Sequence, residues 1–384
     1  MLNESSILRI PGPSPIPPSV QRAMTQPMIG HRGTETSEMI RRIKPELKKI
    51  FGTKQDVMII TGSGTSGLET AAVNVAAEGD EVLVLVSGSF GDRFAKICEE
   101  YKMKTHRIEV EWGEEIVVED VANFLKENKQ IKAVFMTHCE TSTGILNPIA
   151  ELSKAVQENS DALVIVDGVS CVGGVEAEMD AWGVDIFVTG SQKAMMLPAG
   201  LAFIAVSDKA WEVIEANKQS RFYLDLRRYR DNLDKDTTPF TPALSLIFGL
   251  EQSLKLMHEE GLENVYARHT LMKNMTRAAI KALNIPLLTE DNVASATVTA
   301  VKPDNFDPEA LRKSVKTNFN LSLAGGQAHL KGKIFRIGHM GYCTPGDVLQ
   351  YLGIIELGLR DIGVDIELGA GVKAAQEVYL KENN

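Results

Sequence analysis

Residues 57–67 read VMIITGSGTSG, an apolar run followed by glycines in the spacing GxGxxG. Four consecutive apolar residues rich in Val and Ile predict a buried strand, and the glycines predict a tight turn that opens a helix. Glycines let backbone amides approach a ligand closely, and a helix N-terminus carries partial positive charge. The stretch therefore predicts a strand, an anion-binding turn and a helix, although a glycine turn without any ligand has the same pattern.

Five further apolar runs follow and alternate with helical patterns, at residues 82–86, 133–137, 163–166, 186–189 and 202–206. Continuously apolar strands are typical of a parallel sheet that helices cover on both faces. We therefore predict an α/β fold with a mostly parallel, doubly wound sheet.

The pattern changes after residue 211. Residues 244–260 and 262–283 predict two long helices with Gly261 between them, and mixed strand and helix patterns follow. These features predict an N-terminal arm over residues 1–20, a large domain over 21–271 and a smaller C-terminal α+β domain over 272–384.

Composition limits the class of protein. The 384 residues include 41 Lys and Arg against 51 Asp and Glu, a net charge of −10, with no basic tract that would favour nucleic acid. The four cysteines show no CxxC spacing, so neither a zinc site nor a redox dithiol is indicated, and we predict no metal site. We find no secretory signal and no run of 18 apolar residues, and therefore expect a cytoplasmic protein away from membranes.

Two polar residues follow predicted strands at the edge where such sheets bind ligands. Asp167 ends one strand, and Lys193 follows another in the string Gly190-Ser191-Gln192-Lys193. Each alone has an ordinary explanation, a turn cap or a solvated side chain. Together with an anion cradle, they meet the demands of pyridoxal phosphate for its ring nitrogen, aldehyde and phosphate.

Two other positions fit the same cofactor. Phe90 follows a strand where its ring could stack on a cofactor, although core packing would also explain it. Arg336 interrupts an apolar strand and suits a substrate carboxylate, with a salt bridge as the alternative. A dinucleotide is disfavoured, because the run ending at Val86 has no following acid to hold a ribose.

Taken together, these residues resemble a class V, fold type I, pyridoxal-phosphate-dependent aminotransferase of the alanine/serine–glyoxylate or serine–pyruvate group. The resemblance covers nearly the whole chain and depends on five strings: IGHRG from residue 29, GSG from 62, THCETSTG from 137, GSQK from 190 and RIGHMGY from 336.

The resemblance implies a role for each matching residue. Lys193 would form the Schiff base and move protons, Asp167 would hold the ring nitrogen, and Arg336 would bind the substrate carboxylate near Gly30. Phe90, Thr141 and Val169 would contact the ring or its phenolic oxygen. The phosphate would be held by Ser63, Gly64, Thr65, Gln192 and, from the partner subunit of a homodimer with shared active sites, Thr241.

The implied reaction is transamination from alanine, serine or aspartate to glyoxylate or pyruvate. Many relatives have Trp at Phe90 and His at Thr65, which affects specificity more than cofactor binding. An acidic donor needs a second cation, for which His31-Arg32 is a candidate, although an interface loop is an equal explanation.

Alternatives remain within this fold and outside it. Ureidoglycine–glyoxylate and aminoethylphosphonate–pyruvate aminotransferases share the scaffold, and a cysteine desulfurase would need Cys343 as nucleophile. An NAD-dependent dehydrogenase is less favoured because no acid follows Val86, and a non-catalytic binding protein is less favoured because Lys193 and Asp167 are both present.

Overall fold

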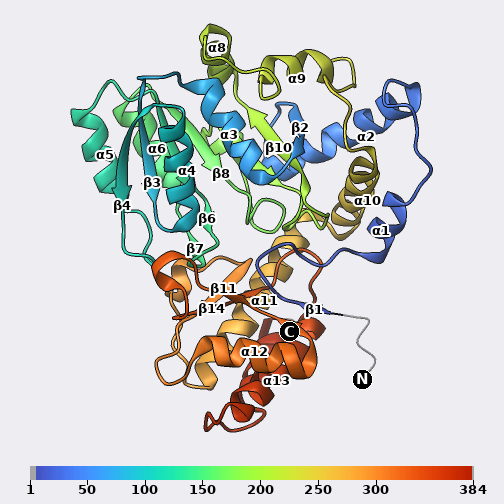
Figure 1. Cartoon of the computed structure of the whole chain (residues 1–384), viewed down its shortest axis with the longest axis vertical. Helices are drawn as coiled ribbons and strands as arrows, with labels where there is room; N and C mark the ends of the chain where they lie inside the picture. Colours follow the sequence, from blue (N-terminus) through green and yellow to red (C-terminus); the bar gives the residue numbers. More distant parts are fainter. Residues whose placement is uncertain (1–5, 383–384) are drawn as a thin grey trace.

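The computed structural model describes residues 6–382, which form a large and a smaller lobe (Figure 1). The large lobe is built on a seven-stranded sheet with the order β2-β10-β9-β8-β5-β3-β4. Its strands are β2 (Val57–Gly62), β3 (Glu81–Val86), β4 (Lys104–Glu109), β5 (Ala133–Thr137), β8 (Leu163–Asp167), β9 (Ile186–Gly190) and β10 (Gly200–Val206). Only β10 runs antiparallel to its neighbours, so the predicted mostly parallel sheet is confirmed.

Alternating side chains of these strands enter two apolar cores, one on each face of the sheet. Val57 and Ile59 of β2 pack in one core, whereas Met58 and Ile60 pack in the other. The first core is closed by α1 (Pro18–Met24), α2 (Thr34–Phe51), α5 (Val118–Glu127), α6 (Ile149–Asn159), α7 (Met179–Trp182) and α10 (Leu244–Glu260). The second is closed by α3 (Gly64–Val75), α4 (Ser89–Glu100), α8 (Asp208–Ala216) and α9 (Leu226–Leu233), which confirms the doubly wound arrangement.

The smaller lobe contains a three-stranded antiparallel sheet in the order β11-β14-β13. Its strands are β11 (Val298–Val301), β13 (Ala324–Gly325) and β14 (Phe335–Gly338), and its helices are α11 (Leu262–Ala282), α12 (Pro308–Phe319), α13 (Pro345–Asp361) and α14 (Ala370–Glu382). A separate apolar core joins these helices to the sheet. The lobe is therefore α+β, as its mixed sequence pattern predicts.

The N-terminal arm connects the two lobes. Its strand β1 (Ile7–Leu8) pairs in parallel with β12 (Leu321–Ser322) of the smaller lobe. Further along, the backbone N–H of Ser14 donates to the carbonyl of Gln192 in the large lobe, at 3.0 Å. The predicted arm over 1–20 includes residues 1–5, which lie outside the described residues, and the boundary drawn at Met272 falls inside α11.

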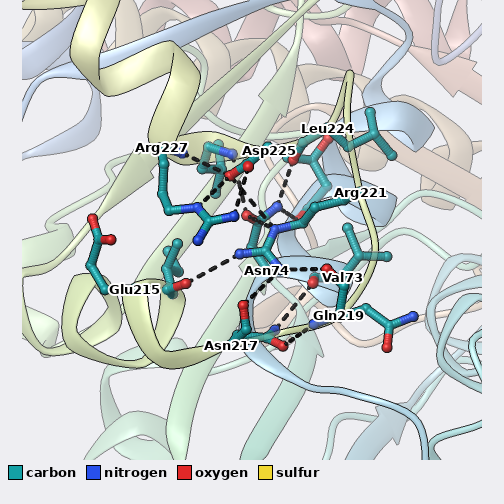
Figure 2. Close-up of polar contacts among 12 residues, drawn as sticks. Val73, Asn74, Glu215, Asn217, Gln219, Arg221, Leu224, Asp225 and Arg227 are labelled. Atoms are coloured by element: carbon teal, nitrogen blue, oxygen red, sulfur yellow. Dashed lines mark hydrogen bonds and ion pairs between the residues drawn. The ribbon is translucent and has the colours of Figure 1, made fainter.

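A buried polar cluster anchors the C-terminal end of α3, the helix that follows the glycine turn (Figure 2). Asn74 is fully buried and donates to the carbonyl of Leu224, at 2.7 Å. Its side-chain oxygen accepts from Arg221 Nε, at 2.8 Å, and Arg221 also caps the carbonyl of Gln219. The cluster thereby fixes residues 217–227 against α3.

Two elements are not among those predicted from the sequence. Strand β4 lies at the sheet edge and has Ile108 as its one apolar residue, so it lacks the continuous apolar run of the inner strands. Helix α2 precedes the region where strands and helices alternate. Across residues 6–382, no helix is both long enough and apolar enough to cross a bilayer.

Candidate active site

Lys193 lies in the turn after β9, at the carboxyl edge of the sheet. Only 8% of its surface is exposed, and its Nζ donates to the carbonyl of Pro11 in the N-terminal arm. Burial lowers the pKa of Lys193 to about 8, the nearby charges of Arg336 and Arg93 add to this effect, and Cys139 and Asp167 oppose it. Near neutral pH an appreciable fraction of this lysine is therefore an uncharged amine, which is the nucleophilic form.

Asp167 ends the neighbouring strand β8 and is also buried. Its Oδ1 accepts a hydrogen bond from the backbone N–H of Val169, at 2.8 Å. Burial raises the pKa of Asp167 to about 7, and no cation of residues 6–382 forms an ion pair with it. This carboxyl group is therefore suited to a cationic partner that enters the site from outside the chain.

The glycine turn after β2 forms a narrow cradle at the N-terminus of α3. Ser63 caps this helix, since its hydroxyl accepts from the N–H of Ser66, at 3.3 Å. A Cβ on Gly64 would lie 2.9 Å from Val169 Cγ2, so glycine is required where the turn meets the loop after β8. Gln192 also reaches this place, and its Oε1 is buried without a hydrogen-bond partner in the described part of the chain.

Phe90 and Thr65 approach the cradle from helices α4 and α3, and both are half-buried. The Phe90 ring centroid lies 6.0 Å from Lys193 Nζ and 4.7 Å from the guanidinium carbon of Arg93. Arg93 Nη1 in turn donates to Thr65 Oγ1, at 3.3 Å. Arg93 has no special signal in the sequence, because its position depends on how α3 and α4 pack.

Arg336 crosses from the smaller lobe to the same site. Its Nη1 donates to the carbonyl of Thr141, at 2.8 Å, and its Nε donates to the carbonyl of Gly325, at 2.9 Å. The hydroxyl of Thr141 contacts that of Ser170, three residues beyond Asp167. Burial lowers the pKa of Arg336 to about 10, which leaves it a cation at neutral pH.

Glu140 is a fully buried residue to which the sequence analysis gave no role. One carboxylate oxygen accepts from the N–H groups of Phe90 and Gly91, at 2.9 and 3.0 Å. The other accepts from the N–H and hydroxyl of Ser142. Burial raises the pKa of Glu140, and these four hydrogen bonds oppose that rise. Glu140 therefore ties the start of α4, with Phe90, to the turn that carries Thr141.

The N-terminal arm completes the enclosure of Lys193. Gly12 has a φ of +115°, and a Cβ there would lie 2.5 Å from Lys193 Cδ. The hydroxyl of Ser14 donates to the Lys193 carbonyl, at 2.7 Å. The early Pro-Gly-Pro string is the sequence signal for this arm, but its contact with Lys193 is a tertiary feature.

Two predicted site residues are not brought to the lysine within one chain. Gly30 is exposed, and a Cβ there would meet nothing within 4 Å. Thr241 is exposed and has no hydrogen bond within residues 6–382, so its role toward a partner subunit stays a prediction. Arg32 donates to the carbonyls of Thr238 and Pro239, which ties it to the 237–239 loop.

The residues present fit pyridoxal phosphate. Asp167 is a buried carboxyl group without a cationic partner in the described chain, and the Lys193 amine has a pKa of about 8. In the cradle, Gln192 Oε1 has no hydrogen-bond partner, and the side-chain amide of Gln192 could rotate to point its N–H groups toward a phosphate. Fold and site thus define an α/β enzyme whose cofactor is held through a lysine.

Comparison with known proteins identifies the family. The profile of Aminotransferase class-V matches residues 11–346, so the chain belongs to this family, whose members depend on pyridoxal phosphate. It is 36% identical to the L-aspartate–glyoxylate aminotransferase of Paracoccus denitrificans, over 96% of this chain and 95% of that protein. It is also 41% identical to a Synechococcus protein named soluble hydrogenase, small subunit, over 98% of this chain and 99% of the relative.

A solved structure agrees with this assignment. The ureidoglycine–glyoxylate aminotransferase of Bacillus subtilis superposes with a TM-score of 0.92 at 32% identity, covering 99% of each chain. The predicted fold type and the predicted pyridoxal-phosphate-dependent aminotransferase are therefore confirmed.

Proposed function

We propose that this aminotransferase moves the amino group of a small L-amino acid, alanine, serine or aspartate, to glyoxylate or pyruvate. The observation that carries the proposal is the buried Arg336, whose guanidinium reaches from the smaller lobe to Thr141 beside Lys193 and Asp167. A cation in that position suits the carboxylate that all these substrates share. The glyoxylate named for the Paracoccus and Bacillus relatives supports the acceptor.

The chain's own residues divide the work. Asp167 would hold the ring nitrogen of pyridoxal phosphate, the cradle of Ser63, Gly64, Thr65 and Gln192 would hold its phosphate, and Lys193 would bind its aldehyde. When bound, the cofactor supplies a carbonyl for the donor amine and a ring that accepts electrons. Lys193 Nζ, with its lowered pKa, is the group that takes and returns a proton at the substrate carbon.

Cysteine desulfurase activity is disfavoured by the state of Cys343. Only 1% of this residue is exposed, and burial raises the pKa of its thiol to about 12. A nucleophilic cysteine must be an accessible thiolate, so Cys343 is unsuited to attack a substrate. Ureidoglycine as donor stays open, because the Bacillus relative shares this scaffold.

We also propose a cytoplasmic homodimer in which Thr241 of one subunit completes the phosphate site of the other. Thr241 is exposed in the single chain, which supports a role outside its own subunit.

The test is the visible absorption spectrum of the purified protein before and after adding L-serine, L-alanine and L-aspartate separately. We expect a yellow protein that one of these donors bleaches, and glyoxylate or pyruvate should restore the colour. Steady-state assays over a panel of donors then rank kcat/KM. A highest value for a long-chain or aromatic donor would contradict the proposed substrate class.

A further inference from the structure

Arg93 is a half-buried cation without a carboxylate partner in the described chain. Its Nη1 donates a hydrogen bond to Thr65 Oγ1, at 3.3 Å, and its guanidinium carbon lies 4.7 Å from the ring centroid of Phe90. The neighbouring Asp92 pairs with Lys96 and Arg107 instead. A cation held without a counter-charge in this way is suited to an anion that binds between α3 and α4.

The phosphate cradle otherwise has no charged side chain. Ser63, Gly64, Thr65 and Gln192 offer hydroxyl, amide and backbone donors, and the α3 N-terminus adds only partial charge. Lys193 and Arg336 contact other groups, Pro11 and Thr141. Arg93 lies close enough for its charge to affect the pKa values of Asp167 and Lys193. Arg93 is therefore the one cation of the described site whose charge is still available to bind an anion.

We propose that Arg93 supplies the positive charge that binds the phosphate of the cofactor, while its contact with Thr65 sets the width of the cradle. The inference depends on the pyridoxal-phosphate chemistry of the proposed function. A guanidinium has five N–H donors in a planar fork. Arg93 can therefore keep the bond to Thr65 and offer further donors to phosphate oxygens.

The test compares two aldehydes that differ only in the phosphate. Cofactor-free protein is titrated with pyridoxal phosphate and with pyridoxal, and the visible band of the lysine-bound aldehyde gives each dissociation constant. For Arg93→Gln we expect affinity for pyridoxal phosphate to fall at least about tenfold, because charge-assisted hydrogen bonds to phosphate are lost. Affinity for pyridoxal should change much less, because only the indirect effect of the Arg93 charge on Asp167 and Lys193 is then lost. Free pyridoxal forms an internal hemiacetal, which lowers its apparent affinity by the same factor for the wild-type protein and for every variant.

Two further variants separate charge from packing. Arg93→Lys keeps the charge but not the fork, and should recover part of the selectivity for pyridoxal phosphate. Arg107→Gln removes an arginine of β4 that pairs with Asp92 and Glu99 of α4, and should change neither constant. The unfolding midpoint of each cofactor-free variant checks that the fold is intact.

The possible outcomes are distinct. Equal losses for pyridoxal phosphate and pyridoxal in Arg93→Gln would overturn the charge role, since Arg93 would then act only by supporting Phe90. Unchanged affinity for both would overturn it as well. A wild-type protein that binds neither aldehyde would instead contradict the proposed function.

Discussion

At the residue scale, Lys193 lies among apolar and backbone groups and close to two arginines. Its pKa of about 8 lies below the ordinary value of 10.5. Since only the neutral amine attacks an aldehyde, we predict that cofactor-free protein captures pyridoxal phosphate faster as pH rises through about 8, and that the rate levels off well below pH 10. Stopped-flow absorbance at the visible band measures this profile.

The control for this profile is a pair of lysine variants. Lys193→Ala should abolish the visible band and turnover while the fold persists. Lys255→Ala, at a position 64% exposed in its side chain, should behave as wild type. A band that survives in Lys193→Ala would mean that another lysine binds the cofactor.

Glu140 permits a second prediction at this scale. Replacing it by Gln turns an amide N–H₂ toward two of the four donors that the carboxylate now accepts from. Each buried donor left without an acceptor costs about 1–3 kcal/mol, so we expect the free energy of unfolding to fall by at least about 2 kcal/mol. Urea unfolding of the cofactor-free protein measures it. Glu109→Gln, at an exposed position, is the control. An equal urea unfolding midpoint in the two variants would contradict the role of Glu140.

At the scale of elements, the N-terminal arm packs directly against Lys193. In Gly12→Ala the new Cβ would collide with Lys193 Cδ and Cε, at 2.5 and 2.7 Å, so either the lysine or the arm must move. We predict slower cofactor capture, together with strain of about 1–2 kcal/mol from the left-handed backbone. Capture is followed at the visible band and stability by urea unfolding.

Gly79→Ala is a matched control for the arm. Gly79 has a φ of +86°, and a Cβ there meets nothing within 4 Å, so this variant carries the backbone strain without the collision. Its unfolding free energy should fall by a similar amount, whereas its capture rate should stay at the wild-type value. Equal capture rates in the two variants would mean that the arm does not shape the lysine site.

Elements differ in how far the sequence predicts them. Inner strands such as β8 and β9 are predicted nearly to the residue, because burial on both faces demands a continuous apolar run. Asp167 and Lys193 follow from the same rule, since the ends of parallel strands share one edge. Glu140, Arg93 and the Gly12 contact escape prediction, because each depends on two segments distant in sequence. The edge strand β4 escapes because its pattern is polar.

At the scale of the whole molecule, three histidines are buried, His138 in the large lobe and His269 and His339 in the smaller lobe. His269 of α11 donates from Nδ1 to the Val265 carbonyl and accepts at Nε2 from the N–H of Gly341. His339, after β14, donates to the Ala296 carbonyl, and its other nitrogen lies 2.9 Å from the Thr299 hydroxyl. His138 follows β5 and packs edge-on against Trp182. A proton on any of them would be buried without a carboxylate partner.

Burial lowers the pKa values of His138, His269 and His339 from 6.5 to about 4, 3 and 3. Near pH 5 the unfolded chain therefore binds close to three protons that the folded chain does not, so these groups make stability fall as pH falls below about 6.5. Asp167 acts in the opposite sense, since its folded pKa of about 7 exceeds the ordinary 3.8 and the folded chain holds one proton more. These four groups alone predict a net uptake of about two protons on unfolding near pH 5, and Glu140, whose pKa burial also raises, acts in the same sense as Asp167 and lowers that number.

The resulting slope tests whether these histidines are neutral. Two protons correspond to a loss of about 3 kcal/mol in unfolding free energy per pH unit of acidification, measurable by urea unfolding of the cofactor-free protein at several pH values. In His339→Gln, whose amide can replace both hydrogen bonds, the slope should fall by about one proton whatever happens to absolute stability. His258→Gln, at a side chain 62% exposed, should leave the slope as it is. An unaltered slope in His339→Gln would mean that His339 keeps its ordinary pKa in the folded protein, and that acid weakens the molecule through other groups.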